Sequence, residues 1–447
     1  MPRYHADLAA RAVPRYTSYP TAVDFTAAVG AERQALALLG IARDTPTSLY
    51  IHIPYCHRIC WYCGCNTGAV GRTSRLDDYL DALIAEIGIV AALFDGTVCS
   101  VHFGGGSPNA LTPAQLARLA DAIRNEFGVS DAAEWAIEID PRGFGADHAA
   151  ALAAMRIHRV SIGVQTFSAP IQRAINRVQP FDEVAGVVAL LRDAGIRHIN
   201  LDLMYGLPHE SEDDIADTID AALTLRPSRV AMFGYAHIPA MLPRQRMIDA
   251  AMLPDDEARF RQSTLAHRLM VEAGYQAIGF DHFAHPRDGL ARAAASGRLR
   301  RNFQGFTDDP ADAVIGLGAS AISHFDGVIV QNEKHVGRYR AAVRSRQLAG
   351  VRGVVRDAED RLRATIIERL LCDGRVDLEA VCARHSMAPS LLIEAFVALA
   401  PLEERGIVSW SGSRLTVSDD DRCYRRVVAA AFDTRSRRKV RAASPAV

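Results

Sequence analysis

The stretch Tyr50-Ile-His-Ile-Pro-Tyr-Cys-His-Arg-Ile-Cys-Trp-Tyr-Cys-Gly-Cys65 holds four of the eight cysteines of this 447-residue chain, spaced Cys-x3-Cys-x2-Cys-x-Cys. The apolar run that leads into it, residues 48–54, predicts a buried strand. Soft thiolate ligands select zinc, Cu(I) or iron–sulfur clusters. Zinc usually takes its remaining ligands from a second pair of Cys or His residues. The remaining cysteines are isolated in the sequence, namely Cys99, Cys372, Cys382 and Cys423. The pattern therefore favours a cubane cluster held by three thiolates with one iron left open, while a zinc knuckle or a disulfide stays as the alternative.

Composition limits the class of protein. The chain is 49% hydrophobic and 23% charged, as in ordinary globular proteins, and its net charge of −1 gives no reason to expect nucleic acid as a partner. Its apolar runs are too short to span a bilayer, and its first thirty residues carry charges without an apolar run. Because half of the cysteines lie in one loop, they do not form a secreted disulfide framework. We therefore expect a cytoplasmic protein with no nucleic-acid and no membrane partner.

Apolar segments alternate with amphipathic segments about six times after residue 48, which predicts a parallel α/β fold. The expected strands are 49–53, 98–103, 135–139, 159–164, 198–204 and 229–235. The expected helices are 77–93, 113–127, 181–194 and 212–225, with N-caps at Asp77, Thr112 and Ser211. Polar or glycine residues stand at nearly every strand end, as in barrels whose C-terminal rim carries the chemistry. The prediction is an incomplete, about six-stranded parallel β/α barrel.

The segments before and after this alternating region have different sequence patterns. Residues 1–40 are expected to form an N-terminal arm or lid, since residues 16–22 are rich in Tyr, Thr and Pro and disfavour helix. Residues 41–345 are expected to form the barrel with its substrate loops, and the pattern loosens into loops over 274–332. Residues 346–447 predict a helical, winged-helix-like domain with helices at 362–371, 378–384 and 390–399, a strand pair within 406–417 and a last helix from about 420. No basic stripe with interleaved aromatics supports DNA binding.

Two levels of resemblance follow from these motifs. Cys56, Cys60, Tyr62 and Cys63 match Cys-x3-Cys-x-aromatic-Cys, the signature of the radical S-adenosylmethionine superfamily. From about Pro14 to the last helix, the chain also resembles the family of oxygen-independent coproporphyrinogen III oxidases. That resemblance is carried by Pro14-Arg-Tyr-Thr-Ser-Tyr-Pro-Thr21, Cys63-Gly-Cys-Asn66, Tyr235-Ala-His-Ile-Pro239, Gly279-Phe-Asp-His-Phe283 and Arg301-Asn-Phe-Gln-Gly305.

The resemblance implies the site residues. Cys56, Cys60 and Cys63 would hold a [4Fe-4S] cluster, and Cys65 would be a catalytic cysteine that does not ligate it. Two molecules of S-adenosylmethionine would bind in adjacent sites, at Tyr50, Tyr62, Gly105, Gly106, Ser107, Glu138, Gln165, Arg177, Asp202, Ala236 and Ile322. The family commonly has Thr where Ser107 stands, so the hydroxyl is kept. From the residues alone, several of these polar groups are more often structural hydrogen-bonders.

The resemblance also implies the reaction: two propionates of coproporphyrinogen III become vinyl groups through a 5′-deoxyadenosyl radical. The implied partners are this substrate and a low-potential electron donor such as a flavodoxin or a ferredoxin, and the protein is expected to be a monomer. Arg or His groups at the rim should meet the four substrate carboxylates. The alternative is a haem-binding chaperone of the same superfamily, which the Cys-x-Cys ending and the Arg-Tyr-Thr-Ser-Tyr-Pro arm disfavour. A structural zinc protein is the alternative from another class.

Overall fold

The computed structural model describes residues 2–71, 74–435 and 444–445. A twelve-stranded sheet of order β10-β11-β9-β8-β7-β6-β5-β2-β14-β15-β16-β17 forms its centre. Seven neighbouring strands of this sheet pair in parallel. One is β14 (Ala313–Leu317), and the other six are β2 (Thr47–Ile53), β5 (Thr97–Gly105), β6 (Gly128–Ile139), β7 (Arg159–Gln165), β8 (His198–Tyr205) and β9 (Arg229–Gly234). The incomplete parallel barrel is therefore confirmed, and all six expected strands are present.

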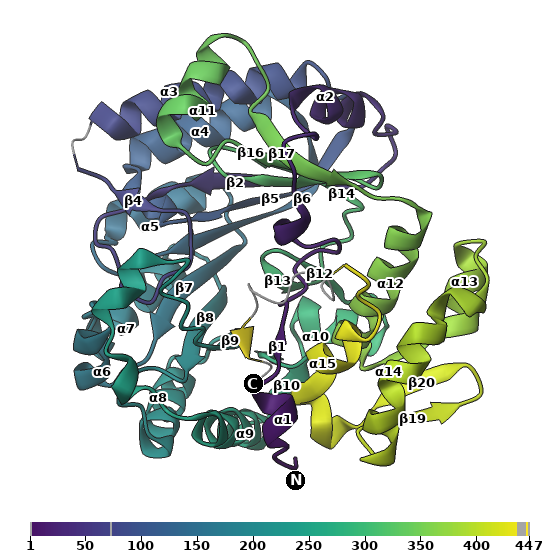
Figure 1. The fold of residues 1–447 in the computed structure, drawn as a ribbon. Helices are drawn as coiled ribbons and strands as arrows, with labels where there is room; N and C mark the ends of the chain where they lie inside the picture. The colour runs from purple at the N-terminus through teal and green to yellow at the C-terminus, as the bar shows by residue number, and fades with distance from the viewer. Residues whose placement is uncertain (1, 72–73, 436–443, 446–447) are drawn as a thin grey trace.

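The crossover helices cover the outer side of this curved sheet, as Figure 1 shows from its top to its lower left. They are α3 (Ser74–Ala91), α4 (Pro113–Glu126), α5 (Ala146–Ala154), α6 (Ala169–Ala174), α7 (Phe181–Asp193), α8 (Glu212–Thr224) and α9 (Asp256–Glu272). Thr112 and Ser211 cap α4 and α8 through capping boxes, as expected. Asp77 as an N-cap was wrong, because it lies in the first turn of α3. A carboxylate is favourable in the first turn as well as at the cap, so the pattern alone does not separate the two.

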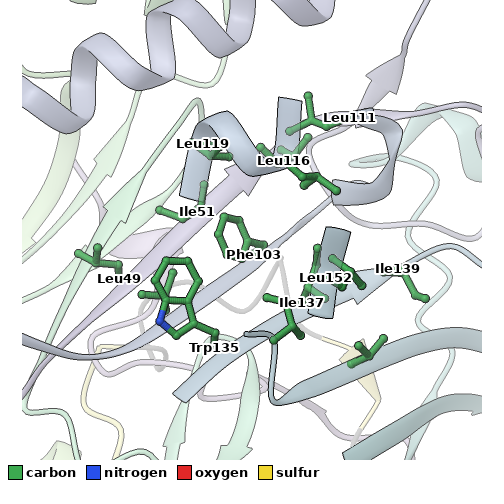
Figure 2. Packing of buried hydrophobic residues seen from close by; sticks show 14 of the residues in the cluster. Leu49, Ile51, Phe103, Leu111, Leu116, Leu119, Trp135, Ile137, Ile139 and Leu152 are labelled. Atoms are coloured by element: carbon green, nitrogen blue, oxygen red, sulfur yellow. The ribbon is translucent and has the colours of Figure 1, made fainter. Parts of the chain in front are cut away.

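The main core lies between the sheet and these helices. Phe103 of β5 and Ile137 of β6 are fully buried and face Leu116 and Leu119 of α4, as Figure 2 shows. Every residue of β2 is buried, which is why its sequence is mostly apolar or aromatic and carries no charged Asp, Glu, Lys or Arg. Burial of this strand on both faces fixes the start of the cysteine loop, which follows it directly.

The expectation of loops over residues 274–332 was wrong. This region contains one helix, α10 (Gly289–Ala295), and seven short strands: β10 (Gln276–Ile278), β11 (His282–Ala284), β12 (Arg300–Asn302), β13 (Gly305–Thr307), β14 (Ala313–Leu317), β15 (Ile322–His324) and β16 (Val328–Asn332). Strand β14 pairs in parallel with β2, and β15, β16 and β17 (Gly350–Val355) follow as antiparallel neighbours. Strands of three to five residues are too short to show a periodicity in the sequence.

The chain ends pack against each other. The arm contains α1 (Ala6–Ala9), β1 (Ala12–Val13), a non-helical stretch over residues 14–21 and α2 (Ala31–Leu39). Tyr16 and Tyr19 are buried in a second core with the C-terminal helices, and the hydroxyl of Tyr16 donates to Asp433 at 3.0 Å. Figure 1 shows this N-terminal segment running beside α15 (Arg425–Ala430). The arm is therefore held by the last helix, far away in sequence.

The C-terminal region has the expected helices, with shifted ends. They are α12 (Ala358–Asp373), α13 (Leu378–Arg384), α14 (Ile393–Glu404) and α15, and α11 (Val336–Arg344) precedes them. The strand pair is part of a three-stranded sheet of β18 (Arg375–Asp377), β20 (Arg414–Val417) and β19 (Val408–Ser411). No helix in the described part of the chain combines the length and the apolar character needed to cross a bilayer.

A buried carboxylate joins the barrel to its antiparallel extension. Glu86 of α3 is fully buried and accepts hydrogen bonds from the Gly318 amide at 2.6 Å, the Tyr339 hydroxyl at 2.7 Å and the Asn332 side-chain amide at 2.8 Å. Burial raises the pKa of Glu86 to about 7, against the effect of these donors. One side chain thus ties α3 to β14, β16 and α11.

We predict that Glu86→Ala destabilises the protein, because it leaves three donors without an acceptor. Each buried unsatisfied donor costs roughly 1–3 kcal/mol, so the free energy of unfolding should fall by about 3 kcal/mol or more. Urea denaturation followed by circular dichroism measures the change. Glu126→Ala, at the exposed end of α4, is the matched control and should leave the midpoint nearly unchanged. A Glu86→Ala midpoint equal to that of the wild type would contradict the role of this network.

Candidate active site

The parallel register brings the sequence-expected residues to one edge of the sheet. His52 pairs with Gly104 and Ile53 with Gly105, so the glycine turn lies beside the start of the cysteine loop. Glu138 pairs with Ser161, and Gly163 pairs with Asp202. The C-terminal ends of β2, β5, β6, β7 and β8 therefore carry the candidate groups, as in other barrels of this kind.

The cysteine loop leaves β2 through β3 (Tyr55–Cys56), which pairs with β4 (Gly68–Ala69) and so closes the loop. Cys60 is buried, Cys56 and Cys63 are half-buried, and Cys65 is exposed. Two contacts attach the loop to the segment after β7: the Trp61 amide donates to Ile175 O at 3.0 Å, and the Asn176 side chain donates to Ile59 O at 2.8 Å. The loop is thus held from both ends and at its middle.

Two guanidinium groups contact the sulfur of Cys60. Nη1 of Arg177 donates to Sγ at 3.3 Å and also lies 3.3 Å from Oδ2 of Asp140, while Nη2 of Arg142 donates to the same sulfur at 3.4 Å. Nearby cations stabilise a thiolate over a thiol. Sequence reasoning named Arg177 but missed Asp140 and Arg142. The available signal was Glu138-Ile-Asp-Pro-Arg142, a strand end with two carboxylates on one face followed by an arginine.

The glycine turn needs its glycines. Gly105 has a φ of +111°, and a Cβ there would lie 2.6 Å from the His52 ring. A Cβ on Gly106 would lie 2.5 Å from Tyr55 O. The Ser107 hydroxyl donates to Cys56 Sγ at 3.7 Å, so the turn is packed directly on the cysteine loop. Backbone so close to the thiols allows a ligand to approach both at once.

Two carboxylates at this edge differ in pKa. Burial acts to raise the pKa of Glu138, but contact with His102 (Nε2 to Oε1, 3.0 Å) and the Gly105 amide outweighs it, and the pKa is lowered. Burial raises the pKa of Asp202 to about 6, against hydrogen bonds from Ser161 at 2.8 Å and from the Asn200 amide at 2.7 Å. Glu138 is therefore ionised at neutral pH, while Asp202 titrates just below it.

The remaining candidate residues are spread over several elements. Gln165 ends β7 with a φ of +67°, and its buried Oε1 has no hydrogen-bond partner among the described residues. The backbone carbonyls of Tyr62 and Ala236 both accept from Gln245 at 3.0 Å, a residue that sequence reasoning missed. The buried Tyr50 lies on β2, with its hydroxyl 3.1 Å from His52 Nδ1. Ile322 lies on β15 and lines a separate cavity of about 540 Å³ beside the arm.

The cysteines of the loop differ in the pKa of their thiols, and therefore in how readily they can bind a metal. The hydrogen bond with Cys65 lowers the pKa of Cys63 to about 6 against the effect of burial, and the Cys65 amide donates to Cys63 Sγ at 3.4 Å. Burial raises the pKa of Cys56 to about 11, so its coordination must displace a proton. The described residues contain no cluster of His, Cys, Asp or Glu gathered as for one metal ion. A cubane gives each thiolate its own iron, so its ligands need not converge on one point.

These residues fit an iron–sulfur cluster with a polar ligand beside it. The loop supplies cysteine sulfurs, of which Cys60 is contacted by Arg142 and Arg177, the glycine turn brings bare backbone next to them, and Gln165 offers an unpaired buried acceptor. Together with the partial barrel, this site defines a protein of the radical S-adenosylmethionine class, and residues 50–222 match the model of the Radical SAM superfamily.

The similarity extends over nearly the whole chain. The chain is 44% identical over 423 residues, 94% of each sequence, to an oxygen-independent coproporphyrinogen III oxidase of Bradyrhizobium diazoefficiens. It is 37% identical over 432 residues to that of Escherichia coli K12, covering 96% of this chain and 94% of the relative. The solved structure of the Escherichia coli coproporphyrinogen III oxidase, a radical SAM enzyme, superposes with a TM-score of 0.90 at 35% identity over 94% of this chain and 97% of that one. The chain therefore belongs to the family of oxygen-independent coproporphyrinogen III oxidases, and its cofactors are a [4Fe-4S] cluster and S-adenosylmethionine.

We predict that Cys56→Ala, Cys60→Ala and Cys63→Ala each prevent the protein from holding a [4Fe-4S] cluster, because each removes one of three ligands. Iron content and the visible absorption band after anaerobic reconstitution measure this. Cys65→Ala is the matched control from the same loop and should keep the cluster while losing turnover. Loss of the cluster in Cys65→Ala would show that the ligands are assigned wrongly.

We predict that affinity for S-adenosylmethionine falls as the pH drops through about 6, because Asp202 has a pKa of about 6 and accepts hydrogen bonds best when ionised. Protonation should weaken binding about tenfold, the effect of losing one charged hydrogen bond. Anaerobic equilibrium dialysis at a series of pH values from about 5 to about 7.5 measures the profile. Asp202→Asn should bind weakly at every pH in this range, and an unchanged profile in that variant would remove Asp202 from the site.

Proposed function

We propose that this protein catalyses the oxygen-independent oxidative decarboxylation of two propionates of coproporphyrinogen III to vinyl groups, giving protoporphyrinogen IX. One observation carries the proposal beyond family membership. Cys65, exposed on the cysteine loop, lines a cavity of about 380 Å³ whose walls also include the arm, the end of β9, the β12–β13 hairpin and the last helix. An organic substrate in this cavity would therefore lie directly beside the loop that holds the cluster.

When bound, the cluster and S-adenosylmethionine supply a radical that removes a hydrogen atom from a propionate β-carbon, after which CO2 and one electron leave. The protein supplies position and electrostatics. Arg142 and Arg177 donate to the sulfur of Cys60, and Gly105 directs its amide towards Glu138. Asp202 and Gln165 present acceptors at the same edge. The arm, attached through Tyr16 to Asp433, forms part of the cavity wall, and a wall that limits access of water protects a reactive radical.

A second molecule of S-adenosylmethionine belongs to this proposal. Phe303 lines both the cavity of Cys65 and the larger cavity that Ile322 lines. Its ring packs edge to face against the ring of Tyr50, with 4.5 Å between the ring centroids. The two cavities thus adjoin at Phe303, so a cofactor molecule in the larger cavity would lie next to a substrate in the cavity of Cys65. We further propose that a flavodoxin or a ferredoxin delivers the electron and that the protein acts as a monomer in the cytoplasm. The haem-chaperone reading has no support, since the relatives are named as oxidases.

The direct test is an anaerobic assay of reconstituted, reduced protein with S-adenosylmethionine and coproporphyrinogen III. We expect CO2 release and a divinyl porphyrin, each dependent on S-adenosylmethionine, and no product from Cys56→Ala. Liquid chromatography with mass detection measures both propionate losses. A cluster-bearing protein that leaves the substrate unchanged and binds haem tightly would overturn the proposal in favour of the chaperone.

A further inference from the structure

Positive charge gathers around the cavity beside Cys65. Among the described residues that line it are four arginines, Arg15, Arg259, Arg301 and Arg426, and a single acidic residue, Asp281. They come from separate parts of the chain: the arm, α9, the β12–β13 hairpin and α15. Guanidinium groups that line a cavity attract anionic groups of a ligand, above all the oxygens of a carboxylate or a phosphate. The cavity therefore has the electrostatic character of a site for an anionic ligand.

Asp281 offsets only part of this charge. It is already engaged by His282, whose Nδ1 lies 2.6 Å from Oδ1. Burial acts to raise the pKa of Asp281, but His282, Arg301 and Arg15 outweigh it and lower the pKa. Burial lowers the pKa of Arg426 to about 10, and the neighbouring Arg15 adds to the effect. Arg15 and Arg301 thus act unfavourably on the charge of Arg426, and a bound anion would offset this repulsion.

Arg301 is the clearest member of the group. Its buried Nε and Nη1 atoms have no hydrogen-bond partner among the described residues, and Nη2 donates to the Arg15 carbonyl at 3.2 Å. Its guanidinium carbon lies 4.4 Å from the ring centre of Phe306 and 5.0 Å from that of Phe280, two rings that contact each other edge to face. A planar guanidinium with unpaired N–H groups can still donate to the oxygens of a carboxylate.

The arm completes the group. The Arg15 guanidinium donates to Gly234 O at 2.7 Å, at the end of β9, while the Arg15 carbonyl accepts from Arg301. The next residue, Tyr16, is buried and bonded to Asp433. Arg15 is therefore placed over the cavity by contacts on both sides, and the residues that line the cavity also attach the arm.

We propose that Arg15, Arg301 and Arg426 form the site that binds propionate carboxylates of the substrate, with Arg301 as the anchor. This rests on the proposed function, since coproporphyrinogen III carries four propionates. Binding those carboxylates on the hairpin, the arm and the last helix orients the macrocycle relative to Cys65. Phe280 and Phe303, which line the same cavity, present apolar surface for its pyrrole rings.

The test measures binding without turnover. Coproporphyrin III, the stable oxidised form of the substrate with the same four propionates, is titrated into cluster-loaded protein and followed by its fluorescence. Its tetramethyl ester, which has no charge, is titrated in parallel. We expect Arg301→Gln and Arg15→Gln to weaken coproporphyrin binding roughly tenfold or more, the effect of losing one charged hydrogen bond, and to leave the ester unaffected. Arg301→Lys should restore only part of the affinity, because an ammonium lacks the planar shape of a guanidinium.

Arg118→Gln, on the outer face of α4, is the matched control and should bind coproporphyrin as the wild type does. Arg15 is exposed, so Arg15→Gln keeps the test valid if substitution of Arg301 or Arg426 disturbs folding. Cluster content and affinity for S-adenosylmethionine should be unchanged in Arg15→Gln. Equal coproporphyrin affinity in wild type, Arg15→Gln and Arg301→Gln would overturn the proposal, and so would equal binding of the ester and the free acid by the wild type.

The two proposals fail in different ways. If the wild type binds coproporphyrin through these arginines but forms no divinyl product, the carboxylate site stands and the proposed reaction falls. If the wild type forms product while Arg15→Gln and Arg301→Gln keep both KM and coproporphyrin affinity, the reaction stands and the carboxylate site falls. A raised KM with nearly unchanged kcat in these variants is the expected kinetic result, since the arginines act on binding.

Discussion

The contact of two guanidinium groups with the sulfur of Cys60 is the interaction on which the site depends. Arg177 is buried and reaches three elements at once, since it also hydrogen-bonds the Gly163 carbonyl on β7 and lies beside Asp140 after β6. A buried guanidinium requires such partners, because desolvation would otherwise make it costly. The same requirement holds the cysteine loop against the strand ends. Charge compensation and loop position are therefore one feature of the structure.

Around this contact, the site consists of two parts: the C-terminal edge of the parallel sheet and a layer of chain that covers it. The parallel strands place the glycine turn, Glu138 and Asp202 at fixed spacing, because strand register leaves little freedom. The covering layer is assembled from the arm, the β12–β13 hairpin and the last helix, joined by the contacts of Tyr16 with Asp433 and Arg301 with Arg15. Chemistry with a radical needs both parts: precise placement beneath and exclusion of water above.

Several features could be predicted from particular residues. The cysteine spacing, the apolar run before it and the polar strand ends predicted the barrel and its active edge, because periodicity and ligand chemistry are local properties. The helix N-caps at Thr112 and Ser211 could also be predicted, because capping depends on residues close together in sequence. The strands between residues 276 and 332 were not, since they are short and stabilised by their neighbours in the sheet. Asp140 and Arg142 were missed because nothing in their local sequence shows that Arg142 contacts the Cys60 sulfur or that Asp140 pairs with Arg177.

The sequence by itself determined the class of the protein, the loop that would hold the cluster and the alternation that makes a parallel barrel. These follow from residue type and spacing over short stretches. Only the tertiary structure decided which charges meet. Arg15, Arg301 and Arg426 are separated by well over a hundred residues, yet line one cavity. Ile322, matched to the same cofactor set as Tyr62, lies beside a different cavity. These contacts depend on the packing of the two chain ends and of the antiparallel part of the sheet. Packing between residues far apart in sequence leaves no signature in a single stretch of sequence.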